Sequence, residues 1–443
     1  MSNTTARYAS LIESSLVPRQ ITTYMILDEY WDLFQCLIRP ICYFLFAIAA
    51  AVLMLGVDTP WRRYLAPSFL VPAWQCLSTI HQIQWPSGFG SFLGVAVTVG
   101  CVEAIAVLYI DETSVQPKQY VKSASASVRP EYSFVDIWKT AFDLRRLRVP
   151  EDNAMRTSTG QTHRRRGHAA THRPFTWWRV ARLLALFLLH YIIVFEIFLN
   201  QLGPFTLTDL EPVKHTYFRR LLSPRYCIPS ERITLRETCI RVFLLASSYI
   251  KPYLLIEGSH ICAAIIFIYI LRSDDPIEWP DLFGSPLEAY TLARFWSRFW
   301  HSLHVASYTT WANWLTNLLP WIKHAKPRTR IALQNLIIFS MTGLIHALVG
   351  YKLDDPCACR TEIQFYLVSW AALVAERRWL ECWRAIKKAR REAEGEDPMA
   401  TKQRMWVIED ALARVVGYVW VILFYLWISP KMYFERMWCM LEP

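Results

Sequence analysis

Glycine and charge are both scarce in this sequence of 443 residues. Only 14 residues are Gly, which excludes a collagen and any Gly-rich repeat. Charged residues make up 19% of the chain, against about 25% in soluble domains. Together these shortages exclude a disordered chain, and they argue against a hydrophilic enzyme.

Several motifs of soluble enzymes are also missing. There is no Gly-x-x-x-x-Gly-Lys-Ser/Thr and no Gly-x-Gly-x-x-Gly, so no nucleotide-binding fold is indicated. There is no Gly-x-Ser-x-Gly, which argues against a lipase-type serine hydrolase. None of the 11 His is followed four residues later by Asp, the pattern of soluble plant-type acyltransferases. None of the 11 Cys lies in Cys-x-x-Cys, so the sequence supports neither a zinc ribbon nor a thioredoxin-like site.

Long apolar runs are abundant instead. Hydrophobic residues make up 53% of the chain, and 20 residues are Trp. A membrane-spanning helix needs about 20 mainly apolar residues. The clear candidates are Cys36–Val57, Gly88–Ile110, Leu183–Asn200, Ile331–Gly350, Glu362–Val374 and Ala411–Ser429.

Two further stretches allow more than one arrangement. Ile240–Leu271 is interrupted by Lys251, Pro252 and Glu257, so it forms either one kinked or re-entrant passage or two short helices. Pro67–Ile80 is short, and it forms either a span or a helix at the membrane surface. We therefore expect an all-α, polytopic integral membrane protein with about seven to nine transmembrane helices.

The chain is basic, with 48 Lys and Arg against 37 Asp and Glu, a net charge of +11. An excess of basic residues suits binding to nucleic acid or to an anionic membrane surface. The apolar runs favour the lipid bilayer, and we expect no nucleic acid partner. Basic loops stay cytosolic, which places residues 139–182 and 377–404 in the cytosol and Asp354–Arg360 in the lumen. The N-terminal segment is polar, so we expect no cleavable signal peptide.

These patterns divide the chain into three parts. N-terminal membrane helices occupy residues 1–110, a basic cytosolic loop rich in Ser, Thr and Arg occupies 111–182, and a membrane core occupies 183–443. Four of the Cys outside the apolar runs are candidates for pairing on the lumenal face: Cys227, Cys239, Cys357 and Cys359.

Ionisable residues at membrane depth are costly and are functional candidates. His346 is the strongest, because it lies in an apolar run with Thr342 and Gly343 one turn before it and Asn335 on the same side. The alternative for this residue is a histidine that is hydrogen-bonded across helices.

Four other deep ionisable residues are Glu103, Glu196, Glu257 and His260. The Glu257-x-x-His260 pair has a spacing that holds metal in some helical bundles, but only with further carboxylates. We favour a satisfied polar pair over a metal site there. Alternatively, the protein is a transporter and not an enzyme, and the same four residues line its ion path.

The segment Leu292–Leu303 has an amphipathic pattern. At about 100° per residue, Arg294, Arg298 and His301 share one sector with Ser297 and His304, and the aromatic residues lie opposite. The pattern predicts a helix at the membrane surface. It acts either as a simple interface anchor or as a cationic surface for the phosphates of coenzyme A.

Three blocks within this region carry a family resemblance. Trp279–Pro286 reads Trp-Pro-Asp-Leu-Phe-Gly-Ser-Pro, Phe295–His301 reads Phe-Trp-Ser-Arg-Phe-Trp-His, and Gly343–His346 reads Gly-Leu-Ile-His in an apolar helix. The three blocks resemble the wax synthase-like branch of the membrane-bound O-acyltransferases. They look most like the fungal members that acetylate terpenoid and meroterpenoid alcohols, over about Trp279 to Leu348.

The resemblance implies roles for named residues. It implies that His346 is catalytic and that His301 stands where plant wax synthases have Asn, so that His301 is either catalytic or positions substrate. With these histidines we group five substrate-binding candidates, which are Arg294, Trp296, Arg298, Trp300 and Asn335.

The sequence therefore predicts an O-acetyltransferase of the endoplasmic reticulum membrane, with acetyl-CoA as donor and a lipophilic terpenoid or meroterpenoid alcohol as acceptor. We expect acetyl-CoA to be a co-substrate, with no bound cofactor and no metal. Two alternatives remain: a wax or sterol ester synthase that uses a long-chain acyl-CoA, and a non-enzymatic transporter or scaffold. The oligomeric state and the position acylated are left open.

Overall fold

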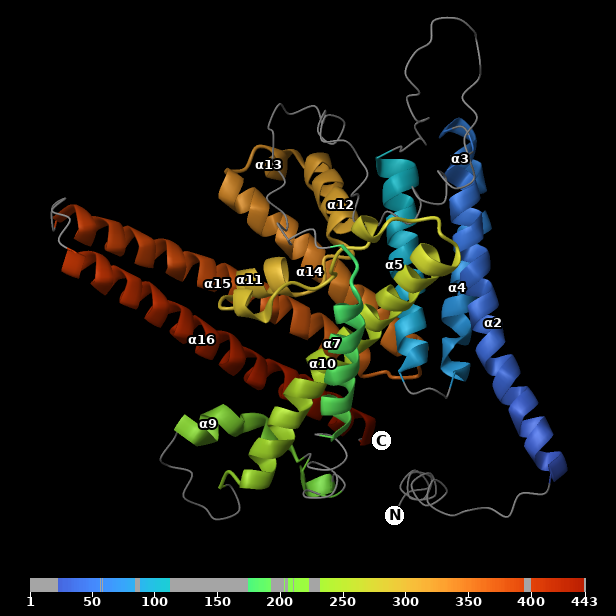
Figure 1. Cartoon of the computed structure of the whole chain (residues 1–443), viewed down its shortest axis with the longest axis horizontal. Helices are drawn as coiled ribbons and strands as arrows, with labels where there is room; N and C mark the ends of the chain where they lie inside the picture. Colours follow the sequence, from blue (N-terminus) through green and yellow to red (C-terminus); the bar gives the residue numbers. More distant parts are fainter. Residues whose placement is uncertain are drawn as a thin grey trace, which may run out of the picture.

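The computed structural model describes residues 23–55, 57, 59–83, 88–111, 174–192, 203, 206–209, 211–222, 232–393 and 400–441 (Figure 1). These residues form helices and connecting turns and contain no β-strand, so the predicted all-α fold is confirmed. The longer helices are α2 (Thr23–Leu55), α4 (Pro67–Thr79), α5 (Phe89–Ile105), α7 (Trp177–Tyr191), α10 (Leu235–Ile265), α12 (Val305–Leu318), α14 (Pro327–Lys352), α15 (Ala358–Ala393) and α16 (Ala400–Leu441).

Shorter helical segments connect them. The α-helical ones are α3 (Thr59–Leu65), α9 (Tyr217–Leu222), α11 (Leu292–Arg294) and α13 (Pro320–Lys323). The 3₁₀ segments are η1 (Ile80–Gln82), η4 (Leu207–Asp209), η5 (Pro212–Thr216), η8 (Pro276–Glu278) and η9 (Pro286–Glu288). The π-helical segments are η2 (Ala106–Ile110), η7 (Ile266–Ile270) and η10 (Phe295–Phe299).

Helices α2, α4 and α5 stand side by side at one end of the molecule (Figure 1). Their shared core contains the fully buried side chains of Cys76 and Ile80. Val349 of α14 joins the same core, so the N-terminal helices pack directly on the part of the chain that carries His346.

Helix α10 settles the arrangement of Ile240–Leu271. It runs unbroken from Leu235 to Ile265 with Pro252 inside it, and η7 continues it to Ile270. The hydroxyl of Thr234 caps its first turn by accepting a hydrogen bond from the Glu237 amide at 3.1 Å. The stretch is therefore one continuous helix and not two short helices, because a transmembrane helix tolerates an internal proline.

Helices α14, α15 and α16 form the C-terminal half. Helix α14 packs along α15, and α15 and α16 run as a long antiparallel pair that extends away from the rest of the molecule (Figure 1). The expected span Glu362–Val374 lies inside the much longer α15. Near the far end of the pair, Arg390 of α15 donates to Glu409 of α16 at 2.7 Å.

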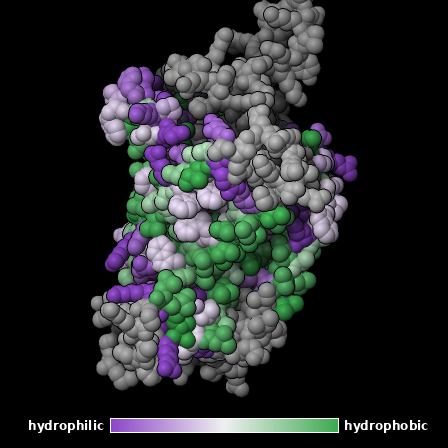
Figure 2. All heavy atoms as spheres, turned by 90° about the vertical axis from the view of Figure 1, so that its left-hand side faces the viewer, coloured by the Kyte–Doolittle hydropathy of each residue, from purple (hydrophilic) through white to green (hydrophobic). Residues whose placement is uncertain are grey.

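Five of the described helices are long and apolar enough to cross a membrane, which confirms the polytopic integral membrane protein. They are Cys36–Leu55, Phe89–Ile110, Leu235–Ile270, Pro327–Lys352 and Ile408–Cys439. Hydrophobic side chains form a broad patch on the face shown in Figure 2, bordered by hydrophilic ones. On α16, Val415, Val416 and Ile422 are more than half exposed, as expected for side chains that face lipid.

Some predictions fall outside the described residues. They concern Glu196, Cys227, the end of the run Leu183–Asn200, and residues 112–173 of the basic loop.

Candidate active site

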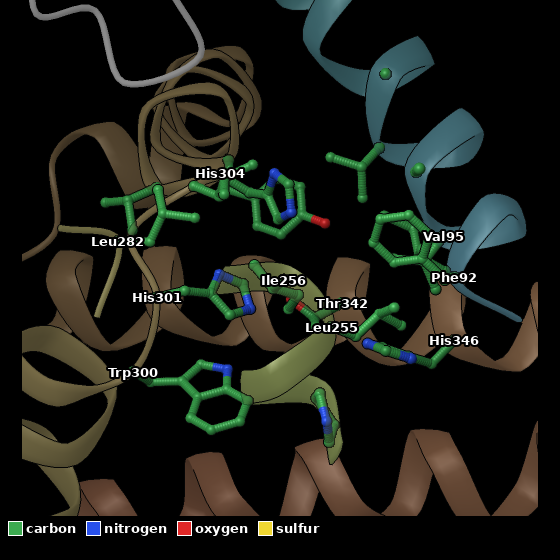
Figure 3. Close-up of a pocket in the computed structure, with 18 of the residues that line it drawn as sticks. Phe92, Val95, Leu255, Ile256, Leu282, Trp300, His301, His304, Thr342 and His346 are labelled. Atoms are coloured by element: carbon green, nitrogen blue, oxygen red, sulfur yellow. The ribbon is translucent and has the colours of Figure 1, made fainter. Parts of the chain in front are cut away.

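A large cavity of about 1420 Å³ lies between the N-terminal and C-terminal helices. Residues of α2, α5, α10, α12, α14, α15 and α16 line it, and most of them are apolar. Five histidines line it: His190, His260, His301, His304 and His346, of which the last three are labelled in Figure 3. An apolar cavity with a few convergent polar groups is the usual form of a site for a small molecule.

The segment that carries two of these histidines is not one surface helix, so that prediction is wrong. The chain forms α11 and then η10, and at Trp300 it becomes extended, with φ −66° and ψ 152°. The break turns His301 and His304 inward, away from the exposed cationic sector that helical periodicity predicted (Figure 3). A π-helical turn is rare and often marks a functional site.

Backbone pairing between two of the sequence blocks fixes this break. The Gly284 amide donates to the Phe299 carbonyl at 2.9 Å, and the Ser302 amide donates to the Leu282 carbonyl at 3.3 Å. A Cβ at position 284 would collide with the Arg298 carbonyl, so only glycine permits this approach. The Trp279–Pro286 block thus holds the Phe295–His301 block at the cavity wall.

His301 and His304 lie at one end of this wall. Their ring centroids are 5.6 Å apart, and the His301 ring also meets the edge of Phe283 at 5.6 Å. Burial, and then the nearby His346, lower the pKa of His301 to about 4. Burial, followed by His301 and His346, lowers the pKa of His304 to about 3. Both rings are therefore neutral at neutral pH, the state in which an imidazole can accept a proton.

Helix α14 brings His346 to the same cavity (Figure 3). Its ring stacks on Tyr366 of α15, with centroids 5.4 Å apart and planes 19° apart. Gly343, one turn earlier, allows α15 to approach, because a Cβ there would lie 3.3 Å from Ile363 Cα. Tyr366 was not predicted from the sequence, where its only signal was its place in the apolar run Glu362–Val374.

The substrate-binding candidates divide into two groups. Trp296, Arg298, Trp300 and Asn335 line the cavity together with both predicted histidines. Arg294 is not among the lining residues; its guanidinium forms an ion pair with Glu288 and lies 4.4 Å from the centroid of the Tyr290 ring.

The deep pair Glu257 and His260 belongs to a buried ionic cluster. Arg179 of α7 forms ion pairs with Glu257 at 2.9 Å and with Asp281 at 2.8 Å. A guanidinium nitrogen of Arg179 lies 3.0 Å from His260 Nδ1. Glu257 and His260 thus share Arg179 as a polar partner, although Glu257 Oε2 accepts no hydrogen bond from the described residues. This cation lies on α7, which the sequence did not indicate.

A cluster of ion pairs borders the cavity where α15 and α16 meet, and Arg436 and Glu362 of this cluster line the cavity. Arg436 of α16 forms ion pairs with Asp355 and, at 3.0 Å, with Glu362. Cys439, one turn later on α16, forms a disulfide with Cys357. The sequence correctly selected Cys357 as a pairing candidate but missed Cys439; the other described candidates, Cys239 and Cys359, are free thiols.

Comparison with known proteins finds one matching family. Residues 279–368 match the membrane bound O-acyl transferase family. No solved structure matches the chain.

Three fungal relatives match at modest identity. "Acetyltransferase aurG" of Calcarisporium arbuscula is 24% identical over 51% of this chain and 50% of its own length. "Acetyltransferase nanB" of Aspergillus nanangensis is 28% identical over 35% of this chain and 34% of its own length. "O-Mevalon transferase macI" of Penicillium terrestre is 30% identical over 24% and 26%. The chain thus spans half or less of the length of these relatives. The resemblance carried by the three sequence blocks is confirmed: over residues 279–368 this chain matches the membrane bound O-acyl transferase family.

Proposed function

We propose that this protein is a membrane O-acetyltransferase that transfers the acetyl group of acetyl-CoA to a hydroxyl of a lipophilic secondary metabolite, such as a terpenoid or meroterpenoid alcohol. The observation that carries the proposal is the position of His346 and His301 in one apolar cavity. The matched family and the printed names of the fungal acetyltransferases support the same reaction.

Acyl transfer requires a base for the hydroxyl and stabilisation of a tetrahedral oxyanion. In the proposed reaction, His346 removes the hydroxyl proton while the oxygen attacks the thioester carbonyl and forms the new C–O bond. The tetrahedral intermediate then collapses, the C–S bond breaks, and the leaving thiolate takes the proton from His346. The products are the acetate ester and free coenzyme A, with no acyl-enzyme.

His301 has two possible roles in this scheme. Its neutral ring either hydrogen-bonds and orients a substrate, as an Asn at that position would, or shares the proton transfer with His346. Its Nδ1 is buried and has no hydrogen-bond partner within the described part of the chain.

In the proposed reaction, the two substrates occupy parts of the cavity that differ in charge and polarity. Arg298 is a cation at the wall, suited to the phosphates of acetyl-CoA arriving from the cytosol. The apolar walls of α2 and α5 suit the body of a lipophilic alcohol arriving from the bilayer. We place the protein in the endoplasmic reticulum membrane, and the reaction needs no metal or bound cofactor.

Microsomes that contain the protein, incubated with labelled acetyl-CoA and a panel of terpenoid alcohols, test this function. We expect labelled acetate esters that are absent from microsomes of the empty host. Competition by long-chain acyl-CoA or by mevalonyl-CoA tests the identity of the acyl group, because macI is named for a different group. Uptake or binding of the alcohols without ester formation would contradict the proposal and favour a transporter.

A further inference from the structure

A buried carboxylate on α15 reaches the segment that carries His301. Glu376 is 7% exposed, and it accepts hydrogen bonds from the Leu292 amide at 2.7 Å and from the Ala293 amide at 3.0 Å. Its Oε2 atom also accepts from the indole N–H of Trp420 on α16 at 2.9 Å. One side chain therefore joins α15, α16 and the start of α11.

Glu376 completes the hydrogen bonds of the first turn of α11. The first amides of a helix have no partners within the helix. Here the Arg294 amide donates to the Thr291 hydroxyl at 3.1 Å, and the Phe295 amide donates to the Thr291 carbonyl at 2.7 Å. The two remaining amides, those of Leu292 and Ala293, are the ones that Glu376 accepts. Each of the four amides at the start of the segment thus has a hydrogen-bond acceptor, and Glu376 is the acceptor for two of them.

The rest of this segment forms part of the cavity wall, whereas Glu376 does not. Trp296, Arg298 and His301 line the cavity within ten residues of the two amides that Glu376 holds. The side chain of Glu376 is not among the lining residues, although its helical neighbour Leu373 is. Glu376 can therefore act on a substrate only through the segment that it anchors.

We propose that Glu376 is a positioning residue that holds the segment 292–304 against the cavity and thereby sets the places of Arg298 and His301. This role rests on the proposed function for its catalytic consequence, but not for the anchor itself. A carboxylate suits the position because each of its oxygens accepts hydrogen bonds. A glutamine would turn an amide N–H₂ toward one of the donors, and one bond would be lost.

The test compares Glu376→Gln with two matched controls in the full-length protein in nanodiscs. Trp420→Phe removes a donor from the same carboxylate but leaves both backbone bonds. Glu381→Gln removes a half-exposed carboxylate five residues later on the same helix. Glutamine is chosen over alanine at position 376 because it fills the same space.

The first readout is hydrogen–deuterium exchange, which needs no substrate. We expect peptides that cover 286–304 to exchange faster in Glu376→Gln, with no change in α2, α5 or α10. Both controls should exchange as the wild type does. Unchanged exchange in Glu376→Gln would overturn the anchor.

The second readout is kinetics at equal amounts of folded protein. We expect Glu376→Gln to lower kcat by about tenfold to a hundredfold, because a small displacement of reacting groups has this effect. We expect both controls to stay within about twofold of the wild type. Faster exchange with wild-type kcat and KM would overturn the positioning role. A wild-type protein that transfers no acetyl group would overturn the proposed function alone, since the exchange readout reports the anchor without turnover.

Discussion

The imidazole of His346 lies nearly parallel to the ring of Tyr366, with 5.4 Å between their centroids. The two residues come from neighbouring helices, α14 and α15, that pack closely along each other. This stack fixes the plane of the imidazole and leaves its edge turned toward the cavity (Figure 3). The orientation of the proposed base is therefore a product of helix packing.

The stack makes Tyr366 the first residue to test. Tyr366→Phe keeps the ring and should keep most of the activity. Tyr366→Leu removes the stack, and an aromatic pair of this kind contributes about 0.5–1.5 kcal/mol, so we expect kcat to fall about twofold to tenfold. Initial rates of acetyl transfer at saturating substrate measure this. Equal activity of the two variants would show that the stack does not orient His346.

Arg298 and Arg294 differ in their position relative to the cavity, and so should their variants. Arg298→Ala removes a cation from the wall, and loss of one charge-assisted contact of about 1.5–3 kcal/mol should raise KM for acetyl-CoA about tenfold to a hundredfold. Arg294→Ala is the matched control, because Arg294 is paired with Glu288. We expect it to change this KM little. The same KM change in both variants would contradict a specific role for Arg298.

The disulfide between Cys357 and Cys439 tests the sidedness of the chain. Disulfides form in oxidising compartments, and the sequence places Asp354–Arg360 in the lumen. We expect the denatured protein to react with two more molecules of a maleimide probe after reduction than before it. Cys439→Ser should abolish this difference and lower the melting temperature, because removal of a native disulfide costs about 2–5 kcal/mol. An identical count before and after reduction would contradict the disulfide and would remove its support for the lumenal placement.

His301→Asn separates the two roles of His301. Asparagine can hydrogen-bond but cannot take a proton at neutral pH. If His301 orients substrate, we expect the variant to keep most of its kcat, with His301→Ala much slower. Should His301→Asn be as inactive as His301→Ala, the two histidines share the proton transfer. Rates of both variants at equal protein level distinguish these outcomes.

Hydropathy was sufficient for most of the fold, because a long apolar run has few alternatives in a membrane. The five helices that are long and apolar enough to cross a membrane all overlap runs that the sequence indicated, whereas the expected number of seven to nine spans stays a prediction. Hydropathy could not decide whether α10 continues through Pro252, since that depends on neighbouring helices. It also missed the full length of α15, because the charged residues after Val374 hide the helix from a hydropathy argument.

The sequence indicated residues of the cavity through their side-chain chemistry. It could not indicate features that depend on hydrogen bonds between distant parts of the backbone. His346, His301, Trp296, Arg298, Trp300 and Asn335 were all selected, and all line one cavity. Helical periodicity placed His301 and His304 on an exposed face, because the break at Trp300 depends on backbone pairing with Leu282 and Gly284. Glu376 was missed because it stands beside Arg377 and Arg378 in a charged run, where a carboxylate is usually solvated.

The rate of acetyl transfer by His346→Ala in microsomes tests the proposed role of His346 most directly. We expect normal insertion and abundance with a rate about 10²–10⁴-fold below that of the wild type, the usual effect of losing a general base. Near-normal transfer by His346→Ala at equal protein level would contradict the central assignment.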